Sequence, residues 1–322
     1  MNNPISIDAA GSPAAETAHV GDQDATMTKT QQRATLRDYI QLTKPGIVFH
    51  NLITAFGGFW VASRWELDWL LLILTMLGTA LIVASGCALN NYLDRELDAK
   101  MARTQERALV TGKLTPGFVL GFGLVLGAIG TVVLGMVNIL TALLGVIGMI
   151  LYVWVYTMMF KRTSVWSTFV GSFSGAVPPV MGYVAVTNTM DAGAWILFLI
   201  LFLWQPPHFW ALGIRRVEEY RAAGFPLLPV VRGSFVTKIS MVRYVVLLVP
   251  VSMLLYFYGY VGEVYMFAAA GLGLIWALMC LQGFQTKDTE EENKWAKKMF
   301  VYSINYLTIL IILMVVTTTH AV

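Results

Sequence analysis

Nine apolar runs of near membrane-spanning length recur along the 322-residue chain. A helix that crosses the hydrocarbon core of a bilayer needs about 20 mostly apolar residues. We place the runs at residues 46–63, 69–91, 117–136, 139–159, 165–187, 193–214, 239–260, 263–283 and 298–318. One run could be a buried core helix, but nine indicate a polytopic membrane protein. The alternation that transmembrane strands need is missing, so we predict an all-α fold with nine transmembrane helices.

Composition supports this fold class and excludes a disordered chain. Hydrophobic residues make up 57% of the chain and charged residues 13%, which is about half the charged share of a soluble domain. The two cysteines, Cys87 and Cys280, both lie in predicted spans. They are typical of packing residues and form neither a metal motif nor a disulfide framework.

Lysine and arginine residues predict the orientation in the membrane. If the N-terminus is cytoplasmic, nine crossings place residues 94–116, 160–164, 215–238 and 284–297 on the same side. Of the 22 Lys and Arg residues, only Arg64 then falls outside, as the positive-inside rule requires. We predict a multi-pass protein of the cell membrane with a cytoplasmic N-terminus and an external C-terminus. The one-sided basic face reflects this orientation and does not predict nucleic-acid binding.

The chain divides into a polar tail and one membrane domain. Residues 1–44 contain no apolar run, so we predict a largely disordered cytoplasmic tail rather than a cleavable signal peptide. Residues 45–322 form the transmembrane domain. Its two longest cytoplasmic loops, 94–116 and 215–238, carry helical charge spacing, and loops of this length are usually functional or disordered.

Polar side chains at the start of the first long loop suit a metal and a phosphate. Asn90, Asp94 and Asp98 are spaced i, i+4, i+8, so they line one face of a helix. Two carboxylates and an amide oxygen at the water edge suit Mg²⁺, which also accepts phosphate oxygens. Arg103 and Arg107 follow four residues apart, and guanidinium groups bind phosphate well.

One alternative remains for this loop. The loop could instead be a solvated helix end whose acids pair with the neighbouring cations Arg95, Lys100 and Arg103. A glycine-rich loop of the kind that binds nucleoside triphosphates is absent from the sequence.

The approach to the second long loop places a histidine inside the membrane. Pro206 and Pro207 should break or kink the sixth span, with His208 directly after them. Ionisable residues within spans are functional candidates, although His208 could also cap backbone groups freed by the prolines. Arg215 and Arg216 follow on the cytoplasmic side. They could bind an anion or form helix-surface ion pairs with acids of the loop.

Further basic residues face the same side. Lys161 and Arg162 end the fourth span, and Lys44 precedes the first. His50, near the inner end of the first span, is interpreted as a packing residue.

Several stretches resemble the UbiA superfamily of intramembrane aromatic prenyltransferases, and within it the protohaem IX farnesyltransferases, or haem O synthases. The stretches are Leu42–Gly46, Ala84–Asp94, Met101–Thr104, Tyr156–Thr163, Trp204–Phe209 and Glu219–Pro229. The resemblance covers about residues 36–318. It implies a UbiA-like helix bundle.

The resemblance also implies a reaction and its residues. Farnesyl diphosphate would donate its farnesyl group to a vinyl group of haem B, with addition of water, to give haem O and diphosphate. Mg²⁺ would be held by Asn90, Asp94 and Asp98. The phosphate oxygens would be held by Lys44, Arg103, Arg107, Lys161 and Arg162.

For the acceptor, the resemblance implies roles for the second loop. His208 would ligate the haem iron or move a proton, and both roles stay open. Arg215 and Arg216 would pair with the haem propionates. A haem A synthase or assembly factors of a terminal oxidase are the implied protein partners, beside the lipid bilayer itself.

One departure from the superfamily bears on the acceptor. Members that prenylate quinone precursors carry a second Asp-rich motif after the sixth span, whereas this chain has only Glu218 and Glu219, among arginines. A quinone-precursor acceptor is therefore the alternative rather than the preferred prediction. A transporter is disfavoured because nearly all charges lie at one rim. The Asp-Gly lead-in of the phosphotransferases for CDP-alcohols is missing before Asp94.

Overall fold

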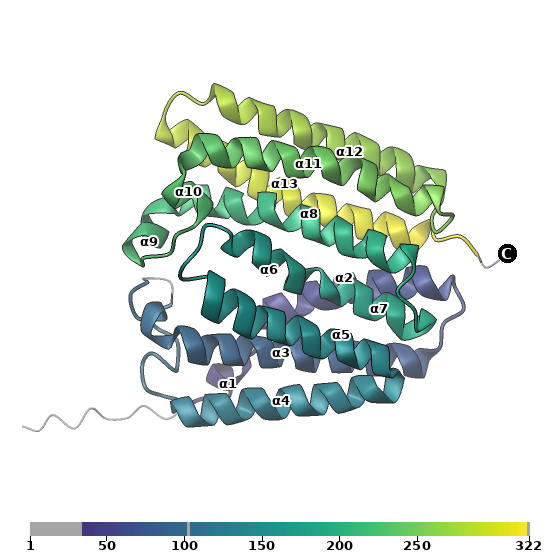
Figure 1. Cartoon of the computed structure of the whole chain (residues 1–322), viewed down its shortest axis with the longest axis horizontal. Coiled ribbons are helices and arrows are strands. Elements are labelled where there is room, and N and C mark those ends of the chain that lie inside the picture. The colour runs from purple at the N-terminus through teal and green to yellow at the C-terminus, as the bar shows by residue number, and fades with distance from the viewer. Residues whose placement is uncertain (1–33, 102–103, 321–322) are drawn as a thin grey trace, which may run out of the picture. The chain divides into compact units, whose positions relative to one another are not determined.

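The computed structural model describes residues 34–101 and 104–320, and these fold into helices that cross the bundle from one rim to the other (Figure 1). Within this part of the chain, nine helical segments are long and apolar enough to span a membrane. In chain order they are α2 (Pro45–Ser63), α3 (Trp69–Asp98), α4 (Pro116–Val137), α5 with η1 (Ile139–Ile150 and Leu151–Phe160), α6 with α7 (Ser167–Gly175 and Val177–Thr187), α8 (Ala192–Arg215), α11 (Gly233–Phe257), α12 with η2 (Glu263–Gln282 and Gly283–Gln285) and α13 (Thr289–Val316). The prediction of nine transmembrane helices is confirmed.

Three helices extend further than the apolar runs predicted, at the rim that carries the two long loops. α3 continues to Asp98, α11 begins at Gly233, and α13 begins at Thr289. Hydropathy marks only the part of a helix that meets lipid, whereas capping decides where the helix starts. In α13, Asp288 accepts a hydrogen bond from the Glu291 amide, and acidic residues fill the first turn, where the helix dipole favours them.

Short helices lie outside the spans. α9 (Val217–Ala222) and α10 (Leu228–Val231) lie in the second long loop. α1 (Leu36–Leu42) lies within the segment that the sequence assigned to the tail. Leu42 of α1 is buried against the loop after α3, so the packed part of the chain begins before the predicted boundary at residue 45. The predicted disorder of residues 1–33 falls outside the described residues.

The two proline pairs have different effects. The fifth span divides at Ala176, between α6 and α7, just before the pair Pro178–Pro179. α8 instead runs without interruption from Ala192 to Arg215 across Pro206 and Pro207. The expected break in the sixth span is therefore not found, because neighbouring helices can supply partners for backbone groups that a proline frees.

α2 packs tightly against α7 because both helices present glycine at their contact. A Cβ atom on Gly182 would lie 1.8 Å from the Ala55 carbonyl oxygen. A Cβ atom on Gly58 would lie 2.0 Å from the Pro179 carbonyl oxygen. Small residues allow two backbones to approach this closely, as is common in membrane bundles. α2 also contacts α3 and α13, so the first and last spans are neighbours.

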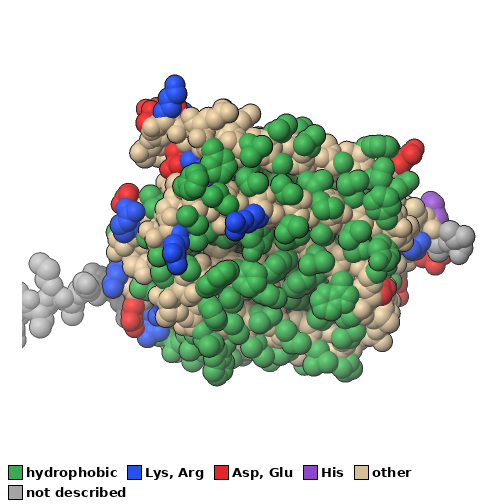
Figure 2. All heavy atoms as spheres, turned by 45° about the horizontal axis from the view of Figure 1, so that its top comes forward, with side chains coloured by type: hydrophobic (Ala, Val, Ile, Leu, Met, Phe, Trp, Pro, Cys, Tyr) green, Lys and Arg blue, Asp and Glu red, His purple; other side chains and the backbone are tan. Residues whose placement is uncertain are grey.

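The surface of the bundle matches a lipid environment. Figure 2 shows hydrophobic side chains over the middle of one face, with most charged side chains gathered at its two ends. Large apolar side chains stay exposed along the spans, among them Ile73, Val132, Trp154, Phe267 and Ile312. An apolar belt of this kind between two polar rims is what a bilayer covers.

The two rims differ in construction. The long loop after α3 lies at one rim with α9 and α10, on the left in Figure 1. At the opposite rim, the Trp65 indole donates to the Thr318 carbonyl at 2.8 Å. The Thr319 amide donates to the Tyr260 carbonyl at 3.1 Å. These bonds tie the α2–α3 turn, the α11–α12 turn and the residues after α13 together; we call them the far-rim tie.

Candidate functional site

The inner end of α3 presents three buried polar side chains. Asn90, Asp94 and Asp98 follow one another at intervals of four residues, and all three are buried. The helix reaches them because it is capped at its start by Asp68, which accepts from the Leu71 amide, and has no helix breaker in its last two turns. The predicted common face of these residues is thus present at the rim that carries the two long loops.

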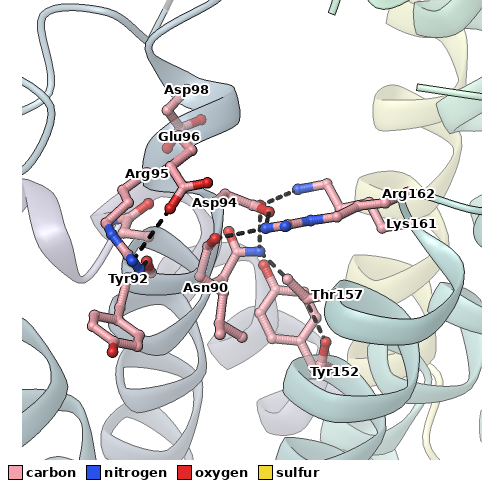
Figure 3. A network of polar contacts seen from close by, with 12 residues as sticks. Asn90, Tyr92, Asp94, Arg95, Glu96, Asp98, Tyr152, Thr157, Lys161 and Arg162 are labelled. Carbon is pink, nitrogen blue, oxygen red and sulfur yellow. Dashed lines mark hydrogen bonds and ion pairs between the residues drawn. The ribbon is translucent and has the colours of Figure 1, made fainter. Parts of the chain in front are cut away.

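Asp94 is the centre of an ion-pair network (Figure 3). Lys161 and Arg162 reach it from the end of η1, and each pairs with one carboxylate oxygen, Arg162 at 3.1 Å. The Asn90 amide donates to the same carboxylate at 2.9 Å. Arg162 also donates to the Leu93 carbonyl at 2.6 Å. The Asp94 side chain is only 2% exposed, so this carboxylate depends on its cations for compensation.

Lys44 joins the network from the start of α2. Its ammonium donates to the Asn90 side-chain oxygen at 2.6 Å. Lys44 itself lies in the left-handed region with φ 51°, directly before Pro45. Burial of the ammonium, together with the nearby cations Arg107 and Lys161, lowers the pKa of Lys44 to about 8. This lysine is therefore held in a site that already has an excess of positive charge.

Asp98 is held by a different cation. Arg107, from the loop after α3, pairs with the Asp98 carboxylate and donates to the Asn91 side-chain oxygen at 3.1 Å. Thr104 donates to the Asp98 carbonyl at 2.8 Å and fixes the turn between them. Arg103, predicted as a phosphate ligand, lies outside the described residues.

The charges of the site do not balance. Four cations, Lys44, Arg107, Lys161 and Arg162, surround two carboxylates. In the described part of the chain, no three His, Cys, Asp or Glu side chains form a group that could hold a metal by themselves. The surplus of positive charge instead fits a multiply charged anion such as a diphosphate.

An apolar cavity of about 100 Å³ lies among the helices that carry this network. α3 contributes Ile82, Gly86 and Cys87, and η1 contributes Tyr152, in the same helix as Lys161. The rest of its lining is mainly Ile, Val, Met, Gly and Pro. The site therefore combines a cationic rim with a greasy interior.

A comparison with family models matches residues 51–304 to the UbiA prenyltransferase family. The chain belongs to the UbiA prenyltransferase family. Among relatives, Protoheme IX farnesyltransferase 1 of Bacillus subtilis (strain 168) is 52% identical over 298 residues, which cover 89% of this chain and 92% of the relative. Protoheme IX farnesyltransferase of Alkalihalophilus pseudofirmus is 48% identical over 300 residues, which cover 91% of this chain and 93% of the relative.

Solved structures agree on the fold. A structure described as giving insights into the biosynthesis of digeranylgeranylglyceryl phosphate synthase in membranes has a TM-score of 0.74 and 21% identity, over 87% of this chain and 98% of its own. A UbiA homologue from Archaeoglobus fulgidus bound to DMAPP and Mg²⁺ has a TM-score of 0.65 and 14% identity, over 84% of this chain and 99% of its own. The predicted UbiA-like bundle is confirmed, and the chain is a prenyltransferase by family.

In this UbiA-family chain, the second long loop packs onto the first. Phe225 and Ala223 of the second loop lie with Met101 of the first in one buried apolar cluster. The Lys161 ammonium lies 5.4 Å from the centre of the Phe225 ring. Phe225 therefore caps the cation that pairs with Asp94 and limits the access of water to it.

The acids of the second loop have partners of their own. Glu218 pairs with Arg221, and Glu219 pairs with Arg216 at 3.4 Å. These are ion pairs along one helix surface, which for Arg216 is the second of the two possibilities given by the sequence. Arg216 therefore lies in a surface ion pair, whereas its neighbour Arg215 lines a separate groove with residues of α13.

His208 also lies apart from the carboxylate network. It sits in α8, and its Nδ1 atom lies 2.7 Å from the Ser303 hydroxyl of α13. The structure thus brings Lys44, Asn90, Asp94, Lys161 and Arg162 into one network, with Arg107 and Asp98 beside it, and leaves the predicted acceptor residues on other elements.

Sequence reasoning missed several members of the site. Thr157 accepts a hydrogen bond from Asn90 at 3.1 Å, and Asn91 donates to the Leu42 carbonyl at 3.1 Å. Thr157 could have been found, since it lies four residues before Lys161. Asn91 could have been found as the neighbour of Asn90. Phe225 and Ser303 carry no such signal, because their roles depend on helices far away in the sequence.

The end of the fourth span winds as a π-helix. In η1 the Lys161 amide donates to the Tyr156 carbonyl, five residues back, at 2.7 Å. Wide turns of this type often occur at functional sites. Here the wide turn carries Tyr152, Thr157 and Lys161 on the side that meets α3, with Thr157 donating to the Tyr152 carbonyl.

Proposed function

We propose that this chain transfers the farnesyl group of farnesyl diphosphate to a vinyl group of haem B. The C1–O bond of farnesyl diphosphate breaks, and a carbon–carbon bond forms at the outer vinyl carbon. Water adds to the inner vinyl carbon and loses a proton, which gives haem O and diphosphate. The observation that carries the proposal is the surplus of cations around Asp94 next to an apolar cavity.

The cations are suited to hold the leaving group. Lys44, Arg107, Lys161 and Arg162 come from three different segments and converge on one rim. Groups that are fixed before the reaction stabilise negative charge as it develops on the diphosphate. In the free enzyme Asp94 and Asp98 hold these cations in place, and phosphate oxygens would take over part of that role.

The residues present also fit a divalent metal, with one condition. Two carboxylates and an amide oxygen on one helix face are hard-oxygen ligands of the kind Mg²⁺ prefers. Each of them already accepts from a cation, namely Lys44 on Asn90, Lys161 on Asp94 and Arg107 on Asp98. A metal would therefore bind together with diphosphate, whose oxygens take up the displaced cations. When bound, Mg²⁺ supplies charge neutralisation on the leaving group.

We place the first part of the isoprenoid chain in the apolar cavity, whose volume of about 100 Å³ is smaller than a whole farnesyl group. Met149, Val177 and Met181 are among its lining residues, and it borders the helices that carry Lys161 and Asp94. An apolar chain that enters this space leaves the water edge, while its diphosphate stays at the rim. Phe225 closes the rim over Lys161, which protects a reactive allylic cation from water.

A porphyrin acceptor is favoured over a quinone precursor. The acids Glu218 and Glu219 of the second loop are engaged by Arg221 and Arg216 and lie on a helix surface. They do not form a second acidic face like that of Asp94 and Asp98. The relatives named protoheme IX farnesyltransferase support the same acceptor.

The location of the site follows from the proposed orientation. We place the active-site rim and the N-terminus in the cytoplasm and the C-terminus outside the cell membrane. The concentration of Lys and Arg at one rim supports this orientation. Contacts with a haem A synthase or with oxidase assembly factors stay predictions.

Mass spectrometry of extracted haem tests the function directly. Purified protein is incubated with haem B, farnesyl diphosphate and Mg²⁺. We expect a gain of one farnesyl group plus one water, which disappears when Mg²⁺ is chelated. Asp94→Asn should lower the rate by at least about 100-fold, because the cations lose the charge that positions them. Glu96→Gln is the matched control, since Glu96 is exposed and, among the described residues, pairs with Arg95 alone.

Two results would contradict the proposal. Unmodified haem from folded wild-type protein would exclude haem B as the acceptor, and quinone precursors would then be tested in the same assay. Full activity of Asp94→Asn would exclude the carboxylate network as the site of the reaction.

A further inference from the structure

The apolar cavity below the cation network ends on one residue from each of three helices. α3 runs from the opposite rim to the site, so Ile82 is the deepest of the α3 residues that line the cavity. For the same reason Gly145 of α5 and Met181 of α7 are the deepest lining residues of their helices. A Cβ atom on Gly145 would lie 3.6 Å from Ile82 Cγ1 and 3.4 Å from Met181 Cε. These three residues meet, and we call them the cavity floor.

Leu134 of α4 lies behind the cavity floor. It is fully buried and packs in one apolar cluster with Ile82 and Met181. Each of its methyl groups faces a glycine on another helix. A Cβ atom on Gly78 would lie 2.6 Å from Leu134 Cδ2, and a Cβ atom on Gly145 would lie 2.8 Å from Leu134 Cδ1. The floor is therefore backed by a branched side chain that is held on both sides.

The walls of the cavity can adapt more easily than this backing. Met149 of α5 and Met181 line the cavity, and methionine is unbranched and flexible enough to fill or free space. An entering apolar chain can displace these two side chains, whereas Leu134 has helix α3 on one side and helix α5 on the other. The cavity can therefore widen beyond about 100 Å³, while its depth stays limited.

The depth of the cavity suits a chain of defined length. Ile82 lies eight residues before Asn90, which is about 12 Å along a helix. Asn90 accepts from a cation of the rim, so a chain whose diphosphate is held there runs along α3 past Cys87 and Gly86. The distance to the floor is comparable to the extended main chain of a farnesyl group. A fourth isoprene unit would have to pass Leu134.

We propose that Leu134, behind the cavity floor, limits the prenyl chain of the substrate to three isoprene units. The substrate class is then a prenyl diphosphate no longer than farnesyl diphosphate. Geranyl and farnesyl chains end above the floor, and a geranylgeranyl chain meets Leu134. The proposal rests on the proposed function, because it takes this cavity as the place of the prenyl chain.

Binding of three prenyl compounds to the purified full chain in detergent tests the limit. The probes are geranyl, farnesyl and geranylgeranyl thiolodiphosphate, in which sulfur replaces the bridging oxygen and slows cleavage. Isothermal titration calorimetry in the presence of Mg²⁺ gives a dissociation constant for each. The wild type should bind the farnesyl compound at least about fivefold more tightly than the geranylgeranyl compound, which is the lower end of the cost of overpacking.

Leu134→Ala should remove the limit. The carbon atoms that are lost leave a space behind the floor, and a longer chain can fill it, so the ratio of the two affinities should fall to about one. Leu248→Ala is the matched control. Leu248 is also fully buried, but it lies in another apolar cluster, formed mainly by α8, α11, α12 and α13. Its loss should leave the ratio as in the wild type.

Two milder variants test the floor and the wall separately. Ile82→Val removes one methyl group of the floor at a small cost in stability, so it decides the question if Leu134→Ala does not fold. It should lower the affinity ratio by about twofold, in the same direction. Met181→Leu keeps the volume of the side chain and removes its flexibility. It should weaken binding of the farnesyl compound more than binding of the geranyl compound.

The outcomes separate this proposal from the proposed function. Equal affinity of the wild type for the farnesyl and geranylgeranyl compounds would overturn the limit even if haem is farnesylated. An unchanged ratio in Leu134→Ala and Ile82→Val, or an equal fall in Leu248→Ala, would overturn it as well. The expected ratios, with no farnesylation of haem by the wild type, would support the limit and contradict the proposed acceptor.

Discussion

At the scale of single residues, the site depends on charges that compensate one another at the edge of the membrane. Asp94 is buried and would be costly to ionise alone, yet Lys161 and Arg162 stabilise its charged form. For Lys44 the surroundings disfavour the charged form, because it contacts the neutral Asn90 amide and lies near the cations Arg107 and Lys161. Removing one charge therefore changes the behaviour of its neighbours.

Lys44 gives the reaction a pH dependence. Burial lowers its pKa to about 8, so the free enzyme loses this positive charge as the pH rises through that value. A neutral amine attracts diphosphate less, and kcat/KM reports groups of the free enzyme. We expect kcat/KM for farnesyl diphosphate to fall above pH 8. In Lys44→Arg the guanidinium stays charged, so the fall should disappear.

The measurement is kcat/KM between pH 7 and pH 9.5 for both proteins. An identical fall in Lys44→Arg would show that another group titrates. A flat wild-type profile would contradict the lowered pKa of Lys44.

At the scale of elements, the two long loops act together as a cover. Phe225 of the second loop is buried against Met101 of the first and lies over Lys161. A cation–π contact of this kind contributes about 1–2 kcal/mol when it is shielded from water. We therefore expect the loops to be part of the reaction site and not simple connections.

Phe225→Ala should open this cover. We expect farnesyl diphosphate to be hydrolysed to farnesol at a rate raised by about fivefold or more relative to haem farnesylation, because water reaches the allylic cation. Phe284→Ala is the control, since Phe284 is partly exposed and contacts Phe235 instead. The ratio of farnesol to haem O is read by chromatography. Equal ratios in both variants would contradict the role of Phe225.

The contact between α2 and α7 depends on glycine. Gly182→Ala places a Cβ atom within 1.8 Å of the Ala55 carbonyl, and backbone cannot move aside as a side chain can. Overpacking costs about 1–3 kcal/mol or more. We expect the apparent midpoint of thermal unfolding in detergent to fall by at least about 5 °C.

Gly121→Ala in α4 is the control for this prediction. No atom lies within 4 Å of a Cβ atom at Gly121. Alanine also favours a helix by about 1 kcal/mol over glycine, so this variant should unfold at an equal or higher temperature. Similar midpoints for both variants would show that the α2–α7 contact accommodates the added methyl group without loss of stability.

The helices also show which parts of the fold and of the site could be predicted from the sequence. The nine spans and the common face of Asn90, Asp94 and Asp98 were predictable, because hydropathy and helical periodicity are local properties. The starts of α11 and α13 were not, since polar turns beyond the lipid carry no hydropathy signal. Partners across helices, such as Thr157 and Ser303, need the tertiary fold. Arg215 and Arg216 are adjacent in sequence, yet they lie in different environments.

At the scale of the whole bundle, orientation decides which compartment supplies the substrates. Cys87 and Cys280 are buried, so single introduced cysteines can report accessibility without removing them. In intact cells, a membrane-impermeant maleimide should label Thr189→Cys, because Thr189 is exposed at the same rim as the far-rim tie. Lys113→Cys, at the active-site rim, should be labelled only after the membrane is permeabilised. The reverse pattern would invert the proposed orientation.

The far-rim tie has a consequence for how the protein is made. A ribosome synthesises residues 317–319 after all nine spans, yet these residues bind Trp65 and Tyr260 and hold α13 beside α2. Until α13 emerges, α2 lacks its last neighbour and the inserted helices form an open array, which the far-rim tie can close only once residues 317–319 follow. The insertion machinery must therefore keep the first span from alternative partners during almost the whole of translation. Cellular quality control would meet the open array as an unfinished protein, so early termination just before Thr317 should shorten its lifetime more than the loss of a few residues suggests.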